Sequence, residues 1–313
     1  MKLHLIATAE DVGTRIDVYL TKQVQGFSRT HAQAAIKAGQ VTVNGKTVTP
    51  HYALRIDEVI DMDAEEKPKE ISMKPWKEGK LDILHEDDDV IVINKPSGML
   101  VHPAVPTDHE SLAHALLAHF PKIAKVGEDV TRPGIMHRLD RDASGVMVVA
   151  KTKKAYENLK EQFQMHDIEK VYTVLVEGTT PEDSGTIRLA IGRKKGDGKM
   201  AARHLAKDGD KEAITHYRVE ERWPRATLLT VRTETGRTHQ IRAHMHAIGC
   251  AVAGDPLYGT GRPNRLPVPH LFLHAGKLSF NHPKTGERMS FEAPLPKELQ
   301  HVIKGLEGNH KSQ

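Results

Sequence analysis

An apolar run that follows a polar loop is the feature that most constrains the fold of this chain. Residues 146–150 are Val-Met-Val-Val-Ala, and such a run of apolar, mostly β-branched side chains predicts a strand buried within a sheet. The polar loop of residues 134–145 leads directly into this strand. Gly134 and Gly145 bracket the loop and permit a tight backbone path. The chain therefore has to fold around a sheet whose buried strand carries a polar loop at one end.

Asp140 is the candidate functional residue of this loop. It stands between Arg138 and Arg141, and a carboxylate held by arginines stays ionised at neutral pH. An ionised aspartate that is not neutralised in a salt bridge is a candidate nucleophile. Charge spacing alone favours a structural interpretation, in which Asp140 and Asp142 pair with the two arginines or cap a turn.

The composition limits the class of protein. The chain has 313 residues, which suggests about two domains. It contains no apolar run of the roughly 18 residues that a membrane-spanning helix needs, and its first residues lack the apolar core of a secretory signal. The single cysteine, Cys250, excludes an internal disulfide and a cysteine-based zinc site. We therefore expect a cytoplasmic monomer without membrane contact, and the net charge of +4 weakly favours a nucleic-acid partner.

Residues 14–63 predict a small separate module. An amphipathic helix begins near Arg15, and Ser28 is a suitable N-cap for a second helix over residues 29–38. An alternating segment follows, and its Asn44-Gly45 pair is a strong signal for a hairpin turn.

This module resembles an S4 RNA-binding domain. The resemblance rests on Arg15 and Asp17, Ser28-Arg29, Gly39 and a Val-x-Val-Asn-Gly segment. It implies that Arg29 and the basic side chains near it face RNA. Asp57-Glu58 replaces the Gly-Asp step that is usual before the last strand of such domains. The alternative is a generic α+β mini-domain whose arginines are solvated.

Residues 64–80 are charged and broken by proline, which predicts a linker, and residues 81–304 predict a larger domain. Acidic residues 87–89 predict a turn between two short strands. Further along the chain, the apolar spacing predicts a helix over residues 111–120, an exposed helix over 153–164 and a strand over 168–178.

A basic segment, residues 187–205, is the main candidate for phosphate contact in the larger domain. Glycines interrupt it, so we expect a flexible loop. A charge run is usually a solvated face, but one so one-sided can follow an RNA backbone, and both interpretations stay open. Its basic residues are Arg188, Arg193, Lys194, Lys195, Lys199 and Arg203.

Three histidines, His239, His244 and His246, follow a predicted strand and a turn at Gly236. Their spacing fits one helical face poorly, and the stretch contains neither a cysteine nor an H-E-x-x-H pattern. We therefore expect no bound metal. A metal-dependent hydrolase built on these histidines is an alternative that metal analysis would test.

The larger domain resembles the RluA-type pseudouridine synthases. His137-Arg-Leu-Asp-Arg-Asp-Ala-Ser-Gly145 is similar to their H-R-L-D-x-x-[TS]-S-G signature, although Ala143 stands where threonine is usual. Lys170-Val-Tyr172 and the Thr-Gly-Arg-Thr-His-Gln-Ile-Arg segment that ends at Arg242 are similar to two further motifs, although Thr233 stands where leucine is more usual. Shorter similarities occur in residues 94–103, 254–259 and 271–275.

This resemblance implies an α+β fold, with a mixed, mainly antiparallel catalytic domain preceded by a small S4 domain. It implies that Asp140 is the catalytic residue, that Arg242 pairs with it and that Tyr172 stacks on the detached base. It further implies that Leu273 makes an apolar contact near the base. Arg138, beside Asp140, is placed to fill the space that a flipped base vacates.

The implied reaction converts uridine to pseudouridine in RNA, most closely in large-subunit ribosomal RNA. The reaction breaks the N1–C1′ bond and rejoins the base through C5, so no net redox change and no cofactor are needed. Asp140 could attack the base, attack C1′ or remove a ribose proton, and the sequence leaves all three open. The alternatives for function are a transfer-RNA pseudouridine synthase and a non-catalytic RNA-binding factor for ribosome assembly.

Overall fold

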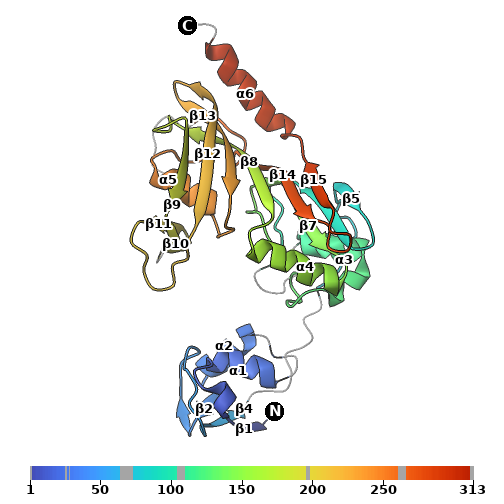
Figure 1. The fold of residues 1–313 in the computed structure, drawn as a ribbon, viewed down its shortest axis with the longest axis vertical. Coiled ribbons are helices and arrows are strands. Elements are labelled where there is room, and N and C mark those ends of the chain that lie inside the picture. The colour runs from blue at the N-terminus through green and yellow to red at the C-terminus, as the bar shows by residue number, and fades with distance from the viewer. Residues whose placement is uncertain are drawn as a thin grey trace. The chain divides into compact units, whose positions relative to one another are not determined.

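The computed structural model of the protein describes residues 2–24, 27, 29–63, 73–103, 110–194, 198–259 and 266–310. The chain divides into two compact units, Met1–Ser72 and Met73–Gln313, which are blue and cyan-to-red in Figure 1. Each unit has a hydrophobic core of its own. Among the described residues, no helix is both long enough and apolar enough to cross a bilayer.

The smaller unit packs two helices against a four-stranded antiparallel sheet with strand order β1-β4-β2-β3. Its elements are β1 (Lys2–Ile6), the 3-10 helix η1 (Ala9–Asp11), α1 (Ile16–Gln23), α2 (Arg29–Lys37), β2 (Val41–Val43), β3 (Lys46–Thr47) and β4 (Val59–Asp63).

Helices α1 and α2 confirm the two predicted helices of this unit. Asn44 and Gly45 have φ angles of 49° and 75°, the left-handed backbone that a tight hairpin turn requires, so the predicted turn is also confirmed. Ser28 lies outside the described residues. Strand β1 is not predicted from the sequence, because no apolar run marks it and its inward Leu3 and Leu5 are only partly buried.

Part of the predicted linker packs on the larger unit. Residues 64–72 lie outside the described part of the chain. Beyond them, the N–H of Trp76 donates to the carbonyl of His114 at 3.0 Å, and Met73 packs against the main core.

The larger unit is built on a nine-stranded sheet with strand order β5-β6-β7-β14-β8-β13-β12-β9, and β15 pairs with β14. Its strands are β5 (Ile83–Glu86), β6 (Val90–Lys95), β7 (Ser144–Ala150), β8 (Glu169–Glu177), β9 (Ser184–Arg188), β12 (Ile214–Trp223), β13 (Ala226–Thr233), β14 (Leu273–Asn281) and β15 (Arg288–Glu292). Its helices are α3 (Leu112–His119), the 3-10 helix η2 (Pro121–Lys125), α4 (Lys153–Gln164), α5 (Gln240–Ala247) and α6 (Lys297–His310).

Strand β7 confirms the predicted buried strand, since all seven of its residues are buried. It pairs in parallel with β14, whereas the other described pairs of the large sheet are antiparallel. The two backbones approach closely at Gly145, which has a φ of 120°. A Cβ atom there would lie 2.2 Å from the carbonyl oxygen of Ala275, so this position requires glycine. The fold is therefore α+β, mixed and mainly antiparallel, as predicted.

Opposite faces of the sheet carry separate apolar clusters because successive side chains of a strand alternate. Val174 and Val176 of β8 join the main core with residues of α3, α4 and α5. Leu175 points to the other face, where Trp223 and Leu299 of α6 belong to the second cluster. Figure 1 shows α3 and α4 beside the β5–β7 half of the sheet and α5 beside the β9–β13 half.

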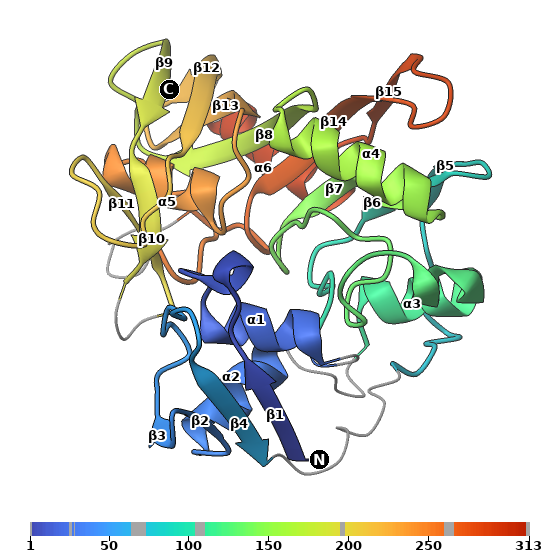
Figure 2. The same ribbon diagram turned by 60° about the horizontal axis from the view of Figure 1, so that its bottom comes forward.

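The prediction of a flexible loop over residues 187–205 is wrong for most of the segment. Strands β10 (Ala190–Arg193) and β11 (Met200–Arg203) pair antiparallel as a two-stranded sheet, the hairpin seen beside α5 in Figure 2. Residues 195–197 lie outside the described part of the chain. Long-range packing stabilises the hairpin, because Ile191 is buried in a small cluster with Ala213, Ala243 and Tyr258.

Candidate active site

A cavity of about 620 Å³ opens in the larger unit beside the loop that precedes β7. Strand β8, helix α4 and the segment between β13 and α5 supply its other walls. Among the described residues that line it, Asp140 is the only acidic side chain. The basic ones are His102, Arg132, His137, Arg138, Lys160, His166, Lys170, Arg237, His239 and Arg242. One carboxylate among so many basic groups makes this cavity the candidate active site.

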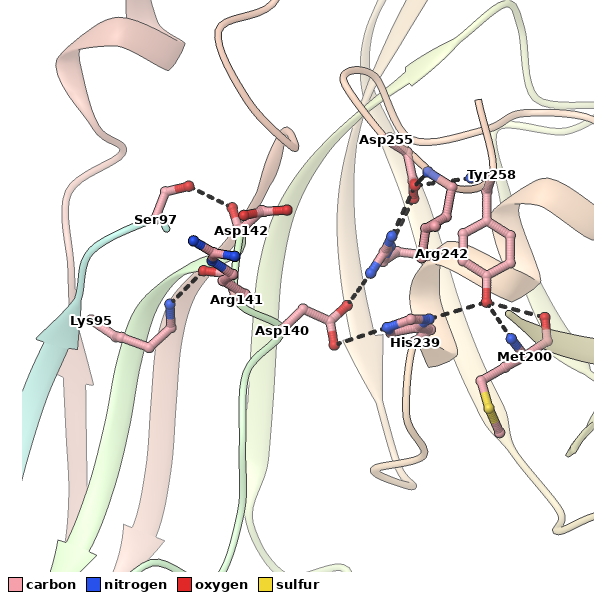
Figure 3. Close-up of polar contacts among 11 residues, drawn as sticks. Lys95, Ser97, Asp140, Arg141, Asp142, Met200, His239, Arg242, Asp255 and Tyr258 are labelled. Carbon is pink, nitrogen blue, oxygen red and sulfur yellow. Dashed lines mark hydrogen bonds and ion pairs between the residues drawn. The ribbon is translucent and has the colours of Figure 1, made fainter. Parts of the chain in front are cut away.

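Arg242 of α5 joins two aspartates. Its Nη1 donates to Asp140 Oδ2 at 2.9 Å, and its Nε and Nη2 donate to the two oxygens of Asp255 at 2.7 and 2.9 Å (Figure 3). Burial alone would lower the pKa of Arg242, but the hydrogen bonds with Asp255 and the charge of Asp140 raise it. A bidentate pair fixes the plane of a guanidinium, so Asp255 aims the third donor at Asp140. The predicted contact between Arg242 and Asp140 is therefore present.

Asp255 is a site residue that is not evident from the sequence alone. It is fully buried, and its Oδ1 also accepts the backbone N–H groups of Leu257 and Tyr258 at 2.8 and 3.0 Å. Gly254, just before it, has a φ of 74°, and a Cβ atom there would lie 2.2 Å from a backbone carbonyl oxygen. The family similarity of residues 254–259, Gly-Asp-Pro-Leu-Tyr-Gly, could have drawn attention to this aspartate. Only the fold shows that it contacts Arg242.

His239 is a second basic residue beside Asp140. Its Nε2 lies 3.9 Å from Asp140 Oδ1, and its Nδ1 lies 3.2 Å from the hydroxyl of Tyr258 (Figure 3). That hydroxyl accepts the N–H of Met200 at 2.8 Å and donates to the Met200 carbonyl at 3.1 Å. Burial lowers the pKa of His239, and the charge of Asp140 opposes this shift. Tyr258 thus connects Met200 of the β10–β11 hairpin to His239, whose ring lies beside Asp140.

A buried lysine anchors the loop that carries Asp140. Lys95, at the end of β6, has no exposed surface. Its Nζ donates at 2.8, 3.0 and 3.0 Å to the backbone carbonyls of Pro96, Met99 and Arg141. Burial lowers the pKa of Lys95 to about 8, while Asp142 and Asp140 oppose this shift.

Two further contacts hold the same loops together. Ser97 Oγ donates to the carbonyl of Asp142 at 2.7 Å, and Arg141 Nε donates to the carbonyl of Gly98 at 3.0 Å. Asp140 thus contacts Arg242, whereas Arg141 contacts the neighbouring loop at Gly98.

Replacing Lys95 by methionine tests this anchor. Lys95→Met keeps most of the side-chain volume but removes the charged donor that three backbone carbonyls share, so we expect the unfolding free energy to fall by about 1–3 kcal/mol. We also expect the turnover rate to fall, because the Asp140 loop loses its support. The exposed Lys153→Met is the control, and equal melting curves for the two variants would contradict the anchoring role.

Tyr172 of β8 and Leu273 of β14 line the same cavity as Asp140 and Arg138. Burial raises the pKa of Tyr172 to about 12, a hydrogen bond with Thr233 opposes the shift and the charge of Asp140 adds to it. The ring therefore supplies neutral aromatic surface at physiological pH. The structure brings these predicted residues to one place, and their catalytic roles stay predictions.

His137 fixes the start of the loop. Its Nε2 accepts the N–H of Val148 at 3.1 Å, and its ring stacks on Phe163 with centroids 4.6 Å apart. Burial lowers the pKa of His137 to about 3, so the ring is neutral. This histidine ties the loop to β7 and α4.

A buried amide network fixes the turn before α5. Gln240 Nε2 donates to the carbonyl of Ile214 at 2.9 Å and to Thr215 Oγ1 at 3.0 Å, and its Oε1 accepts Thr235 Oγ1 at 2.7 Å. His244 joins the network, with Nδ1 2.9 Å from Thr215 Oγ1. His239 thus faces Asp140, whereas His244 serves the fold, and the ring of His246 lies against Tyr258 with centroids 5.7 Å apart.

The predicted RNA-contact residues are spread over both units. Arg138 is exposed at the cavity, and Arg193 is exposed at the end of β10. The N–H of Lys194 donates to the Lys199 carbonyl at 3.0 Å across the hairpin. Lys195 lies outside the described residues. A second cavity of about 540 Å³ beside this hairpin shares residues 236–238 with the first.

Arg29 is partly engaged within the small unit. Its Nε donates to the buried Asp17 at 3.1 Å, and its side chain remains 54% exposed. Arg15 and Gln33 also donate to Asp17, at distances between 2.7 and 3.0 Å. Arg29 therefore helps to order α1 and α2 while its side chain still meets solvent.

The fold thus places one carboxylate, held by a buried arginine, in a cavity lined mainly by basic and neutral side chains. A family model described as RNA pseudouridylate synthase matches residues 89–247, and an S4 domain model matches residues 14–60. The chain belongs to the RNA pseudouridylate synthase family, with an N-terminal S4 domain. It is thus a pseudouridine synthase, and its partner is RNA.

Relatives and solved structures agree with this assignment. An uncharacterised RNA pseudouridine synthase of Bacillus subtilis is 40% identical and covers 98% of this chain and 99% of its own. The ribosomal large subunit pseudouridine synthase D of Neisseria meningitidis is 38% identical, over 97% of this chain and 82% of its own. The structure of human RNA pseudouridylate synthase domain containing 4 is 25% identical, with a TM-score of 0.57 over 72% of this chain and 92% of that one.

Proposed function

We propose that this enzyme converts specific uridines of large-subunit ribosomal RNA into pseudouridine, with Asp140 as its catalytic carboxylate. The observation that carries the catalytic assignment is the cavity in which Asp140 is the only described acidic side chain and Arg242 donates to it. Relatives named ribosomal large subunit pseudouridine synthase D, similar over almost the whole chain, support the ribosomal target.

The residues of the cavity have separate tasks in this proposal. Arg242 keeps Asp140 ionised and oriented, since Asp255 fixes its guanidinium. Tyr172 and Leu273 hold the uracil ring between the breaking of N1–C1′ and the forming of C5–C1′. Attack on the base, attack on C1′ and removal of a ribose proton all begin from the ionised Asp140. The atoms rearrange within one nucleotide, so the proposal needs no cofactor.

The base has to leave its stack to reach Asp140, which costs a few kcal/mol. Arg138, exposed at the cavity, is placed to occupy the vacated position in the RNA. Residues 14–63 serve as the RNA-binding module and residues 81–304 as the catalytic domain. The proposal includes that the enzyme acts as a monomer in the cytoplasm.

Purified protein incubated with separate RNAs tests the target. The substrates are protein-free large-subunit ribosomal RNA, precursor ribosomal particles and transfer RNA, and the product is mapped by chemical probing of pseudouridine. We expect discrete sites in the ribosomal RNA and none in transfer RNA. Sites in transfer RNA alone would overturn the ribosomal target and leave the enzyme class intact.

Removal of the small unit tests its role. We expect deletion of residues 1–72 to weaken binding and to reduce the slope of log affinity against log salt, by about 0.7–0.9 for each phosphate that the protein no longer neutralises. The deletion stops before Met73 because that residue packs on the larger unit. The single-turnover rate at saturating RNA should change little, because Asp140, Tyr172 and Arg242 all lie in the larger unit.

The control for this deletion is the melting curve of the truncated protein. A folded truncation with an unchanged salt slope would show that the small unit does not contact RNA. A folded truncation whose chemical step collapses would show that the unit takes part in catalysis.

A further inference from the structure

We propose that Lys170 holds a backbone phosphate next to the flipped uridine, as a charged subsite inside the active cavity. The inference rests on the proposed function and assigns a role to a residue that the catalytic scheme leaves unused. Lys170 and Tyr172 stand two positions apart on β8, so they project from the same face of the strand. Both line the cavity that holds Asp140.

Lys170 is a buried cation with weak internal partners. It is 8% exposed, and its Nζ lies 3.3 and 3.4 Å from the carbonyls of Glu234 and Thr235, beyond the usual N–H···O range. Its Nζ also lies 5.9 Å from the centroid of the Phe163 ring. Within the described residues its ammonium forms no ion pair with a carboxylate, and a buried ammonium without a counter-ion is costly.

Lys95 shows how the same fold satisfies a lysine that is purely structural. Lys95 does not line the active cavity, and its ammonium donates to three carbonyls at 2.8 to 3.0 Å. Lys170 makes two long hydrogen bonds instead, and it faces an open cavity. The pKa of each lysine is lowered to about 8, chiefly by burial, and the charge of Arg237 contributes to the lowering at Lys170. An anion near Lys170 would offset the effects of burial and of Arg237, because it would favour the charged form of the lysine.

The ligand supplies such an anion. A nucleotide that enters the cavity with its base brings its ribose and adjoining phosphates along. A cavity of about 620 Å³ lies within the size of pockets that enclose whole ligands. With the uracil between Asp140 and Tyr172, the proposal places the neighbouring phosphate at the part of the wall formed by Lys170 and Arg237, which line the same cavity. Its charge matches this wall, since Asp140 is the only described acid in the lining.

A binding cycle tests the subsite. The probe is a synthetic RNA hairpin that contains a uridine modified by the wild-type enzyme, whether ribosomal or transfer RNA. It is made with ordinary phosphates, or with one uncharged methylphosphonate on the 5′ or the 3′ side of that uridine. Affinity is measured in the Asp140→Asn background, so that no product forms, with and without Lys170→Met.

We expect Lys170→Met to weaken binding of the ordinary RNA by about tenfold, as the loss of a charge-assisted hydrogen bond requires. One of the two methylphosphonates should weaken binding to the Lys170 protein by a similar factor. The same methylphosphonate should have almost no effect on the Lys170→Met protein, because the two changes remove one interaction. If the two losses multiply at both positions, Lys170 does not contact either phosphate and the proposal is wrong.

Two further variants separate the subsite from a structural role. Lys170→Gln keeps donors for the Glu234 and Thr235 carbonyls but removes the charge, so it should lose affinity like Lys170→Met. Full affinity in Lys170→Gln would overturn the proposal and make Lys170 a structural tether. Lys160→Met is the matched control, since Lys160 lines the same cavity but pairs with Glu128, and its effect should multiply with that of each methylphosphonate.

Failure of the subsite differs from failure of the proposed function. An enzyme that modifies transfer RNA and not ribosomal RNA contradicts the ribosomal target but still allows the cycle. Suppose instead that the enzyme modifies ribosomal RNA but the affinity losses from Lys170→Met and from each methylphosphonate multiply. That result contradicts only the subsite.

Discussion

Asp140→Asn should yield a folded protein that binds its RNA and forms pseudouridine at least about 1,000-fold more slowly than the wild type, as removal of a catalytic nucleophile typically does. The amide oxygen can still accept Arg242 Nη1, which now lies 2.9 Å from Asp140 Oδ2. Asp255 still compensates the buried guanidinium, so no charge is left without a partner. The change therefore removes the reactive charge and keeps the surrounding geometry. Single-turnover conversion of saturating RNA is the measurement.

Asp142→Asn is the matched control for this variant. It makes the same isosteric change two residues away in the same loop, where the Asp142 backbone carbonyl accepts Ser97. We expect nearly wild-type conversion from Asp142→Asn. Conversion by Asp140→Asn within about tenfold of wild type, a barrier change of about 1.4 kcal/mol, would remove Asp140 from the catalytic role.

Arg242→Lys should lower the single-turnover rate on the order of 100-fold, with little change in RNA affinity. Lysine keeps the positive charge but loses the planar fork that donates to Asp255 and Asp140 together. One ammonium cannot reproduce both interactions, so Asp140 loses its fixed position. Rate and affinity are measured on the same RNA.

Asp255→Asn tests the support that Asp255 gives to Arg242. It leaves Arg242 and Asp140 in place but weakens the bidentate bond that aims the guanidinium, so we expect a smaller loss of rate than from Arg242→Lys. If Arg242→Lys instead lowered the affinity and left turnover unchanged, Arg242 would be a phosphate contact and not the partner of Asp140.

Local patterns sufficed where short-range physics decides the structure. Strand β7 follows from its β-branched run, and α4 (Lys153–Gln164) coincides with the predicted helix because Thr152 caps it by accepting the N–H of Ala155. The Asn44-Gly45 turn follows from left-handed backbone preference. In each case, residues close together in the sequence determine the local structure.

Long-range contacts decided what the sequence could not show. Asp140 and Arg242 are 102 residues apart, and only the resemblance to a family suggested that they meet. Asp255 appeared only within a short family similarity, residues 254–259, and the fold is what places it against Arg242. The β10–β11 hairpin was predicted as a loop because its charges and glycines mask Ile191, whose burial depends on partners from α5 and beyond. Lys95 carried no local sign that it would hold three carbonyls.

The most direct test compares the pseudouridines of large-subunit ribosomal RNA from cells with and without the gene. Complementation with the wild-type gene and with the Asp140→Asn gene completes the comparison. The proposed function predicts that specific pseudouridines disappear on deletion, return with the wild-type protein and stay absent with equal amounts of Asp140→Asn. An unchanged set of pseudouridines after deletion would contradict the ribosomal target. Full restoration by Asp140→Asn would contradict the catalytic role of Asp140.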